Sequence, residues 1–198
     1  MKKFHKLFST CLPVREENID TDQIVPARFL KVTSREGFGT YLFYDWRFDK
    51  SFGGAQDKSN TKCVFNNPKY KGAKILVAGN NFGCGSSREH AAWAIAEYGF
   101  RVVVSSSFGD IFYNNALKNG LLPISVKPKE LEILFQIIEK KSQTEITVDL
   151  KKQKIHTFHF PIDSFRKTCL LKGVDELGYI LSHEGKIKQF EQRQNIFV

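Results

Sequence analysis

The sequence predicts an α/β fold in which βαβ units form a mixed sheet covered by helices. Two observations support this prediction. Between residues 75 and 126, short apolar runs alternate with helix-forming stretches, as strands alternate with helices in βαβ units. Further along, residues 144–150 and 154–160 form a pair of runs with the pattern of a hairpin.

The first part of the chain is predicted to consist of short extended pieces and loops. These are FHKLFSTCLPV at 4–14, the turn-rich REENIDTDQIVPARFLKV at 15–32, and an aromatic cluster at 41–48. The next stretch, 49–72, is polar and contains Gly53-Gly54 and Asn67-Pro68, so it is predicted to be a long loop. Loops of this length in compact domains are usually functional or mobile, and we expect this one to be a mobile loop with the properties of a lid.

Regular elements follow in order. The apolar run ILVA at 75–78 suits a buried strand, and EHAAWAIAEY at 89–98 suits a helix that ends at Gly99. The pattern then predicts a strand at 101–105, a helix at about 107–118, a strand at 121–126, a helix opened by Pro128, the hairpin, and a helical segment at 163–181.

Length and composition indicate one globular domain spanning residues 1–198. The formal net charge is +9, which favours encounters with anions, but the basic residues are scattered and match no nucleic-acid motif. No run approaches the length of a membrane span, and no secretory segment is recognised. A cytoplasmic protein that binds neither nucleic acid nor membrane is expected.

The four cysteines are predicted to be reduced and to hold no metal. They lie far apart and form no C-x-x-C pair, so neither a local zinc site nor an iron-sulfur site is expected in this chain. Cys84 has no conspicuous base beside it and is expected to be inert. His90 is expected to be a packed core histidine.

The stretch NNFGCGSSREH at 80–90 carries most of the functional information. Ser86 and Glu89 have the spacing of a capping box, which would explain the serine structurally. A cap, however, requires neither the preceding Gly83 and Gly85 nor the following Arg88. Glycines allow close approach of a ligand, a helix N-terminus favours anions, and arginine can hold a carboxylate with two hydrogen bonds.

Nucleotide and hydrolase motifs do not fit this turn. A Walker loop needs a lysine that is absent here, the dinucleotide fingerprint would place glycine at Arg88, and the G-x-S-x-G pattern fails around Ser86. The anion is therefore expected to be a small carboxylate. Asp20 and Asp22 can join the site on one side of an extended segment, or they can serve turn formation.

NIDTDQIVPARFL at 18–30, YLFYDWRF at 41–48 and residues 80–124 resemble the small subunit of bacterial 3-isopropylmalate dehydratase, in the aconitase superfamily. The resemblance implies a swivelling-type β/β/α layered domain like the aconitase C-terminal domain. It also implies a large-subunit partner that carries the iron-sulfur cluster, with no cofactor bound by this chain. The implied reaction converts 2-isopropylmalate to 3-isopropylmalate through 2-isopropylmaleate in leucine biosynthesis. A related dehydratase acting on homocitrate or a methylated malate is the alternative.

The resemblance also implies roles for individual residues. Ser86 corresponds to the catalytic base, and Ser87 and Arg88 to the groups that hold the substrate carboxylate. Thr21 and Asp22 correspond to polar residues lining the same site. The segment Arg28, Phe29 and Leu30 corresponds to the part that contacts the variable portion of a 2-hydroxy dicarboxylate substrate.

Overall fold

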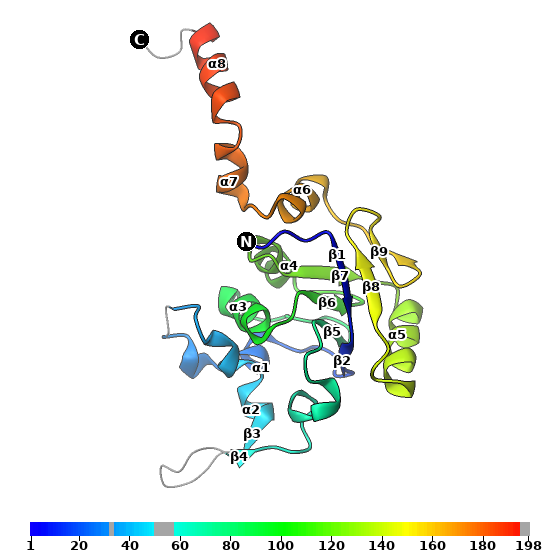
Figure 1. Ribbon diagram of the computed structural model, residues 1–198. Coiled ribbons are helices and arrows are strands. Elements are labelled where there is room, and N and C mark those ends of the chain that lie inside the picture. The colour runs from blue at the N-terminus through cyan, green and yellow to red at the C-terminus, as the bar shows by residue number, and fades with distance from the viewer. Residues whose placement is uncertain (32–33, 50–57, 195–198) are drawn as a thin grey trace.

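A computed structural model describes residues 1–31, 34–49 and 58–194, and these form two sheets with helices packed on them (Figure 1). The inner sheet has the order β2-β5-β6-β7, and all of its strands run parallel. The four strands are Cys11–Val14 (β2), Ile75–Ala78 (β5), Val102–Ser105 (β6) and Leu122–Ser125 (β7). Every residue of β5 and β6 is buried, as expected for a parallel sheet covered on both faces.

The second sheet is antiparallel and has the order β1-β8-β9-β10. Its strands are Lys6–Ser9 (β1), Ile146–Asp149 (β8), Lys154–Ile155 (β9) and Phe158–His159 (β10). The predicted hairpin is confirmed by the pairing of β8 with β9. Residues 154–160 are not one strand, because the chain turns at His156, where φ is +51°.

Helices cover the parallel sheet on both faces. On one face Leu76, Ala78 and Val103 belong to the same buried cluster as residues of α3 (Glu89–Tyr98) and α4 (Asp110–Lys118). On the other face Ile75 and Val77 pack with α5 (Pro128–Lys140) and with strand β8 of the antiparallel sheet. This order of layers confirms the predicted β/β/α arrangement with βαβ units, and the parallel and antiparallel pairings fall in two separate sheets.

Short helices replace much of the extended structure predicted before residue 50. The reason at α1 (Thr21–Ile24) is local: the Asp20 carboxylate accepts from Gln23 N (2.8 Å), and the Gln23 side chain accepts from Asp20 N (2.9 Å). This reciprocal pair satisfies donors at the start of the helix. The other short elements are α2 (Tyr44–Arg47) and 3-10 turns at Ala27–Phe29, Phe38–Tyr41, Val64–Asn66 and Pro68–Tyr70.

The predicted loop at 49–72 is described only in part. Residues 50–57 lie outside the described residues, and the expected mobility of the segment stays a prediction. On either side of them, Phe48–Asp49 (β3) pairs antiparallel with Lys58–Ser59 (β4). The rest of the segment carries the two 3-10 turns after residue 63.

The C-terminal segment is helical, as predicted for 163–181, and continues beyond that range. It contains α6 (Ser164–Lys172), α7 (Glu176–Leu181) and α8 (Glu184–Gln194), with a break at Gly173, where φ is +72°. In Figure 1, α7 and α8 form an arm that projects away from the two sheets. Among the described residues, no helix combines the length and apolar character that crossing a bilayer requires.

Candidate active site

The candidate site is a corner formed by two segments that are distant in sequence. The loop that leaves β5 runs through residues 79–88 to the start of α3. Its Gly83 and Cys84 amides donate to Ile19 O (2.7 and 3.2 Å), and Thr21 N donates to Cys84 O (3.0 Å). These backbone hydrogen bonds fix residues 19–21 against the turn, so the DTD segment and the GSSR segment lie side by side.

The two glycines of the turn serve the protein's own backbone geometry. Both have left-handed φ values, +72° at Gly83 and +83° at Gly85, which side chains other than glycine adopt only with strain. A Cβ at Gly83 would also lie 2.3 Å from Cγ of Phe112, whereas the nearest atom to one at Gly85 is Asp20 Cβ at 3.3 Å. The glycine at position 83 is therefore required by packing against Phe112. The sequence had indicated instead that a glycine here allows a ligand to approach closely.

Ser86 does not cap the helix that follows it. Helix α3 begins at Glu89 with Arg88 as its N-cap residue, and no side chain caps it. The Glu89 carboxylate instead accepts from Asn119 Nδ2 (3.0 Å) and Trp93 Nε1 (3.1 Å). These bonds, above all the one from Asn119, lower the pKa of Glu89. The capping-box explanation of Ser86 is therefore wrong.

Ser86 and Ser87 are exposed at the surface of this chain. The N-terminus of α3 lies at the surface as well, because the first buried residue of this helix is Ala91. Both serines are therefore accessible to a molecule that binds at the corner.

Arg88 is held by Asp22. Its Nη2 donates to Asp22 Oδ2 (2.9 Å), its Nη1 donates to Oδ1, and Nη1 also approaches the Val25 carbonyl (3.4 Å). The Arg88 side chain is 13% exposed and that of Asp22 is 51% exposed, so the contact lies at the edge of the surface. Within the described residues, Nε and the second hydrogen of Nη2 make no hydrogen bond. One edge of the guanidinium is thus paired, and the adjacent edge remains open to another carboxylate.

Thr21 holds the loop that carries Ser86 and Ser87, here called the serine loop, in place. It is 2% exposed, and its Oγ1 donates to the Ser86 carbonyl (2.8 Å). Asp20 caps α1, whereas Asp22 pairs with Arg88. The two carboxylates therefore have different tasks, and the turn-forming interpretation is confirmed for Asp20.

The 27–29 turn lies just beyond the Val25 carbonyl that Arg88 approaches. Arg28 pairs with Asp45, with Nη1 at 3.0 Å from Oδ2. Phe29 stacks on Tyr41 with ring centroids 4.3 Å apart, and Leu30 packs against the buried cluster under α3. No pattern in the sequence indicated Asp45, because its ion pair with Arg28 depends on how the 3-10 turn at Ala27–Phe29 packs against α2.

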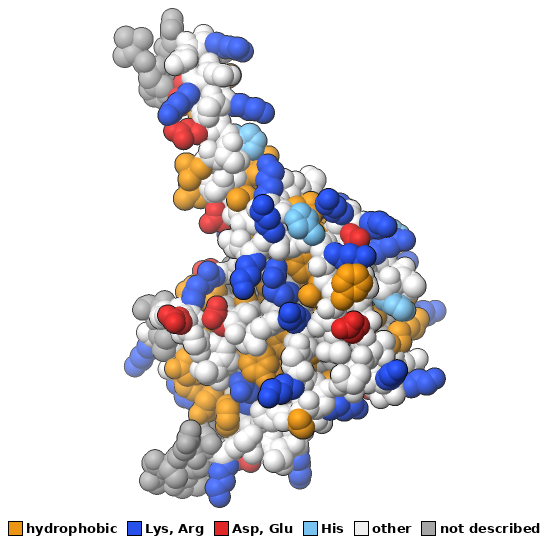
Figure 2. Space-filling view, viewed as in Figure 1, with side chains coloured by type: hydrophobic (Ala, Val, Ile, Leu, Met, Phe, Trp, Pro, Cys, Tyr) orange, Lys and Arg blue, Asp and Glu red, His pale blue; other side chains and the backbone are white. Residues whose placement is uncertain are grey.

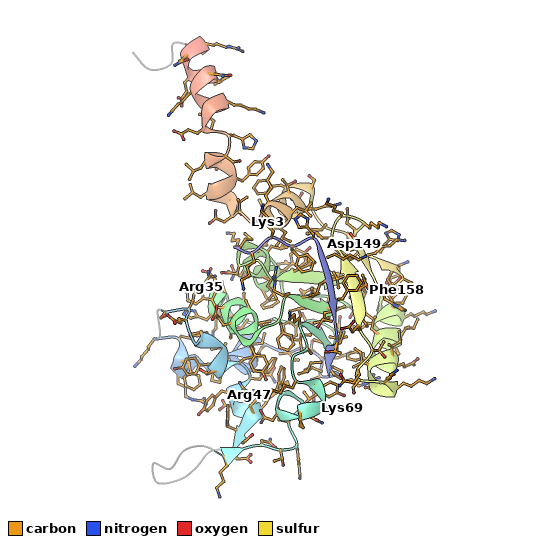
Figure 3. The ribbon with its side chains drawn as sticks, in the orientation of Figure 1. Lys3, Arg35, Arg47, Lys69, Asp149 and Phe158 are labelled. Carbon is orange, nitrogen blue, oxygen red and sulfur yellow. The ribbon has the colours of Figure 1, made fainter. Side chains whose placement is uncertain are left out.

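His90 is a packed residue, as predicted, and its ring contacts those of Phe38 (5.3 Å) and Trp93 (4.7 Å). Arg35 lies beside the same helix, over the Trp93 ring at 4.8 Å (Figure 3). Among the described residues, no three His, Cys, Asp or Glu side chains are grouped as metal ligands would be. The four cysteines are on separate elements, and burial raises the pKa of Cys11, Cys63 and Cys169. This donor set does not fit an iron-sulfur cluster.

The β/β/α layers and the serine corner together define an aconitase-type swivelling domain. A family model described as the aconitase C-terminal domain matches residues 1–129. The chain belongs to this family and, within it, to the small subunits of 3-isopropylmalate dehydratase.

The relatives that support this assignment match over nearly their whole length. A 3-isopropylmalate dehydratase small subunit of Christiangramia forsetii is 54% identical over 98% of this chain and 95% of its own. One from Lactococcus lactis subsp. lactis is 49% identical over 98% and 99%. The crystal structure of 3-isopropylmalate dehydratase from Methanocaldococcus jannaschii is similar, with a TM-score of 0.63 and 25% identity over 94% of this chain and 99% of that one.

Proposed function

We propose that this chain is the small subunit of a two-subunit hydro-lyase that converts 2-isopropylmalate to 3-isopropylmalate through 2-isopropylmaleate, in leucine biosynthesis. The observation that carries the proposal is the exposed Ser86-Ser87 pair beside an arginine whose second edge is open. The names of relatives about 50% identical over the full chain support the choice of substrate.

Arg88 and Ser87 bind the substrate carboxylate. Because Asp22 occupies the Nη1–Nη2 edge of Arg88, the guanidinium is held in a fixed orientation before the substrate arrives. The Nε–Nη2 edge then offers two parallel donors, which is the geometry that a carboxylate accepts best. In this proposal Asp22 positions Arg88.

Ser86 removes the proton from the carbon next to that carboxylate. A serine hydroxyl is a very weak acid, so its deprotonated form needs stabilising charge nearby. The open N–H groups at the start of α3 and the Arg88 cation supply it, and their effect grows when water is excluded. Since both serines are exposed on this chain, the partner must supply the water-excluding wall.

Thr21 keeps the serine loop in place through the Ser86 carbonyl, and it acts as a positioning residue. Arg28, Phe29 and Leu30 contact the variable part of the substrate, with Arg28 oriented by Asp45. The cluster is proposed to reside on the large subunit, because the cysteines of this chain do not form its ligand set. The assembly is proposed to work in the cytoplasm.

The test is reconstitution with a cluster-bearing large subunit, followed by an assay of 2-isopropylmalate, homocitrate and methylated malates. We expect no activity from this chain alone and turnover of isopropylmalate by the mixture. Turnover of another acid in place of isopropylmalate would favour the related dehydratase. An active complex in which Ser86→Ala retains full turnover would remove Ser86 from its role.

A further inference from the structure

The arm formed by α7 and α8 carries apolar side chains that the described part of the chain covers only in part. These residues are between 40% and 64% exposed: Leu177, Ile180, Leu181, Ile187 and Phe190. In Figure 2, orange side chains are seen on the lower part of the arm, at α7, and in Figure 3 the side chains of both helices stand clear of the sheets. A concentration of this kind on a projecting element marks an interaction surface.

The spacing of these residues is that of a docking face on a helix. Leu177, Ile180 and Leu181 have the i, i+3, i+4 pattern of one face of α7. In α8, Ile187 and Phe190 are three residues apart, which places them on one face of that helix. Helices with such a stripe bind by laying it into an apolar groove.

The arm is attached firmly at its base. Tyr179 packs edge-on against Phe165 of α6, with centroids 5.0 Å apart, and Arg166 pairs with Glu176. Asp175 caps α7 by accepting from Gly178 N (2.7 Å). The apolar stripe is therefore presented in a set direction from the body of the protein, which lowers the entropy lost on binding.

The position of the arm in the sequence indicates which partner it binds. The aconitase C-terminal domain match ends at residue 129, so the arm lies outside the part common to that domain family. The match to the Christiangramia forsetii small subunit covers 98% of the 198 residues and leaves about four unmatched, fewer than the 11 residues of α8 alone. The arm therefore belongs to the part shared with proteins named as small subunits.

We infer that the arm docks its Leu177–Phe190 face into an apolar groove of the large subunit and so joins the two chains. The inference depends on the proposed two-subunit assembly. Association of two copies of this chain through their arms is disfavoured, because each copy carries a formal charge of +9 and the copies repel each other. The arm adds no compensating charge, since its three acidic and three basic residues cancel.

The experiment measures the affinity between this chain and the cluster-bearing large subunit for two full-length variants. The arm variant carries Ile180→Glu and Ile187→Glu, and the matched control carries Ile133→Glu on α5, where Ile133 is 43% exposed. Glutamate favours helix, so both variants should keep the circular dichroism and melting temperature of the original. We expect the arm variant to weaken association at least about 100-fold, as loss of central apolar contacts does at interfaces, and the control to leave it unchanged.

Sedimentation and steady-state kinetics separate the other outcomes. An arm variant that binds the large subunit as tightly as the original overturns the inference, and so does an isolated chain that dimerises through these two isoleucines. At saturating large subunit the arm variant should regain the original kcat and KM, because its site is intact. If the original chains associate but fail to turn over isopropylmalate, the proposed substrate fails while the docking result stands.

Discussion

Arg88→Lys tests the carboxylate site most directly. Lysine keeps the charge and can still approach Asp22, but it cannot present two parallel donors to a second carboxylate. Because the Arg88 side chain is only 13% exposed, the lost bond is a charge-assisted one in a poorly hydrated place. Its loss costs about 1.5–3 kcal/mol, which corresponds to about a 10- to 150-fold higher KM for isopropylmalate.

The assay is steady-state turnover of the reconstituted complex over a range of isopropylmalate concentrations. The fold should be nearly unaffected, since the Asp22 side chain is half exposed and such a pair contributes below about 1 kcal/mol. That loss lowers the melting temperature by less than about 4 °C in a chain of 198 residues. An unchanged KM in a folded, fully associated variant would refute the assignment of Arg88.

Asp22→Asn tests whether Asp22 orients Arg88 for the substrate or competes with the substrate carboxylate for it. If Asp22 orients the guanidinium, the loss of its charge should raise KM about fivefold, since about 1 kcal/mol of orienting interaction disappears. If its carboxylate instead blocks the substrate, KM should fall. A lower KM would contradict the two-edge arrangement proposed for Arg88.

Three further predictions follow from the corner and its surroundings. Ser86→Ala should abolish turnover in the complex yet change the free energy of unfolding by less than about 0.5 kcal/mol, because Ser86 caps no helix; a larger loss in urea denaturation would contradict this. Gly83→Ala should destabilise the chain by at least about 2 kcal/mol, owing to its φ of +72° and the phenyl ring 2.3 Å from the added Cβ. Gly185→Ala, in α8 with nothing within 4 Å, is the control and should stabilise slightly. Folding lowers the pKa of Glu89 from its usual 4.5. Its ionised carboxylate therefore contributes fully to the free energy of unfolding above pH 4.5, and this contribution is lost as the pH falls through the pKa of the folded state. The difference in unfolding free energy between the original chain and Glu89→Gln should therefore shrink in acid. A difference that stays constant from neutral to acid pH would argue against the lowered pKa of Glu89.

The regular half of the fold follows from local sequence patterns. The run ILVA at 75–78 forms β5, and EHAAWAIAEY forms α3 with the boundaries expected from its composition and Gly99. Hydrophobic period and helix-stop signals act over a few residues, so they can be recognised without knowing the neighbours. The DTD and GSSREH motifs likewise identified the residues that meet in the corner.

The partners of those residues were decided by the tertiary structure. The spacing of Ser86 and Glu89 suggested a cap, but the Glu89 carboxylate accepts from Asn119, the C-cap residue of α4, and α3 begins only at Glu89. Asp22 and Arg88 are 66 residues apart, and their pairing depends on the backbone bonds that bring residues 19–21 against the turn. The helical segment at 163–181 was visible in the sequence, whereas α8 beyond it and the projection of α7 and α8 as an arm were not. Local patterns determine which backbone conformation a segment takes, whereas long-range packing determines what its side chains touch and which apolar faces remain for another chain.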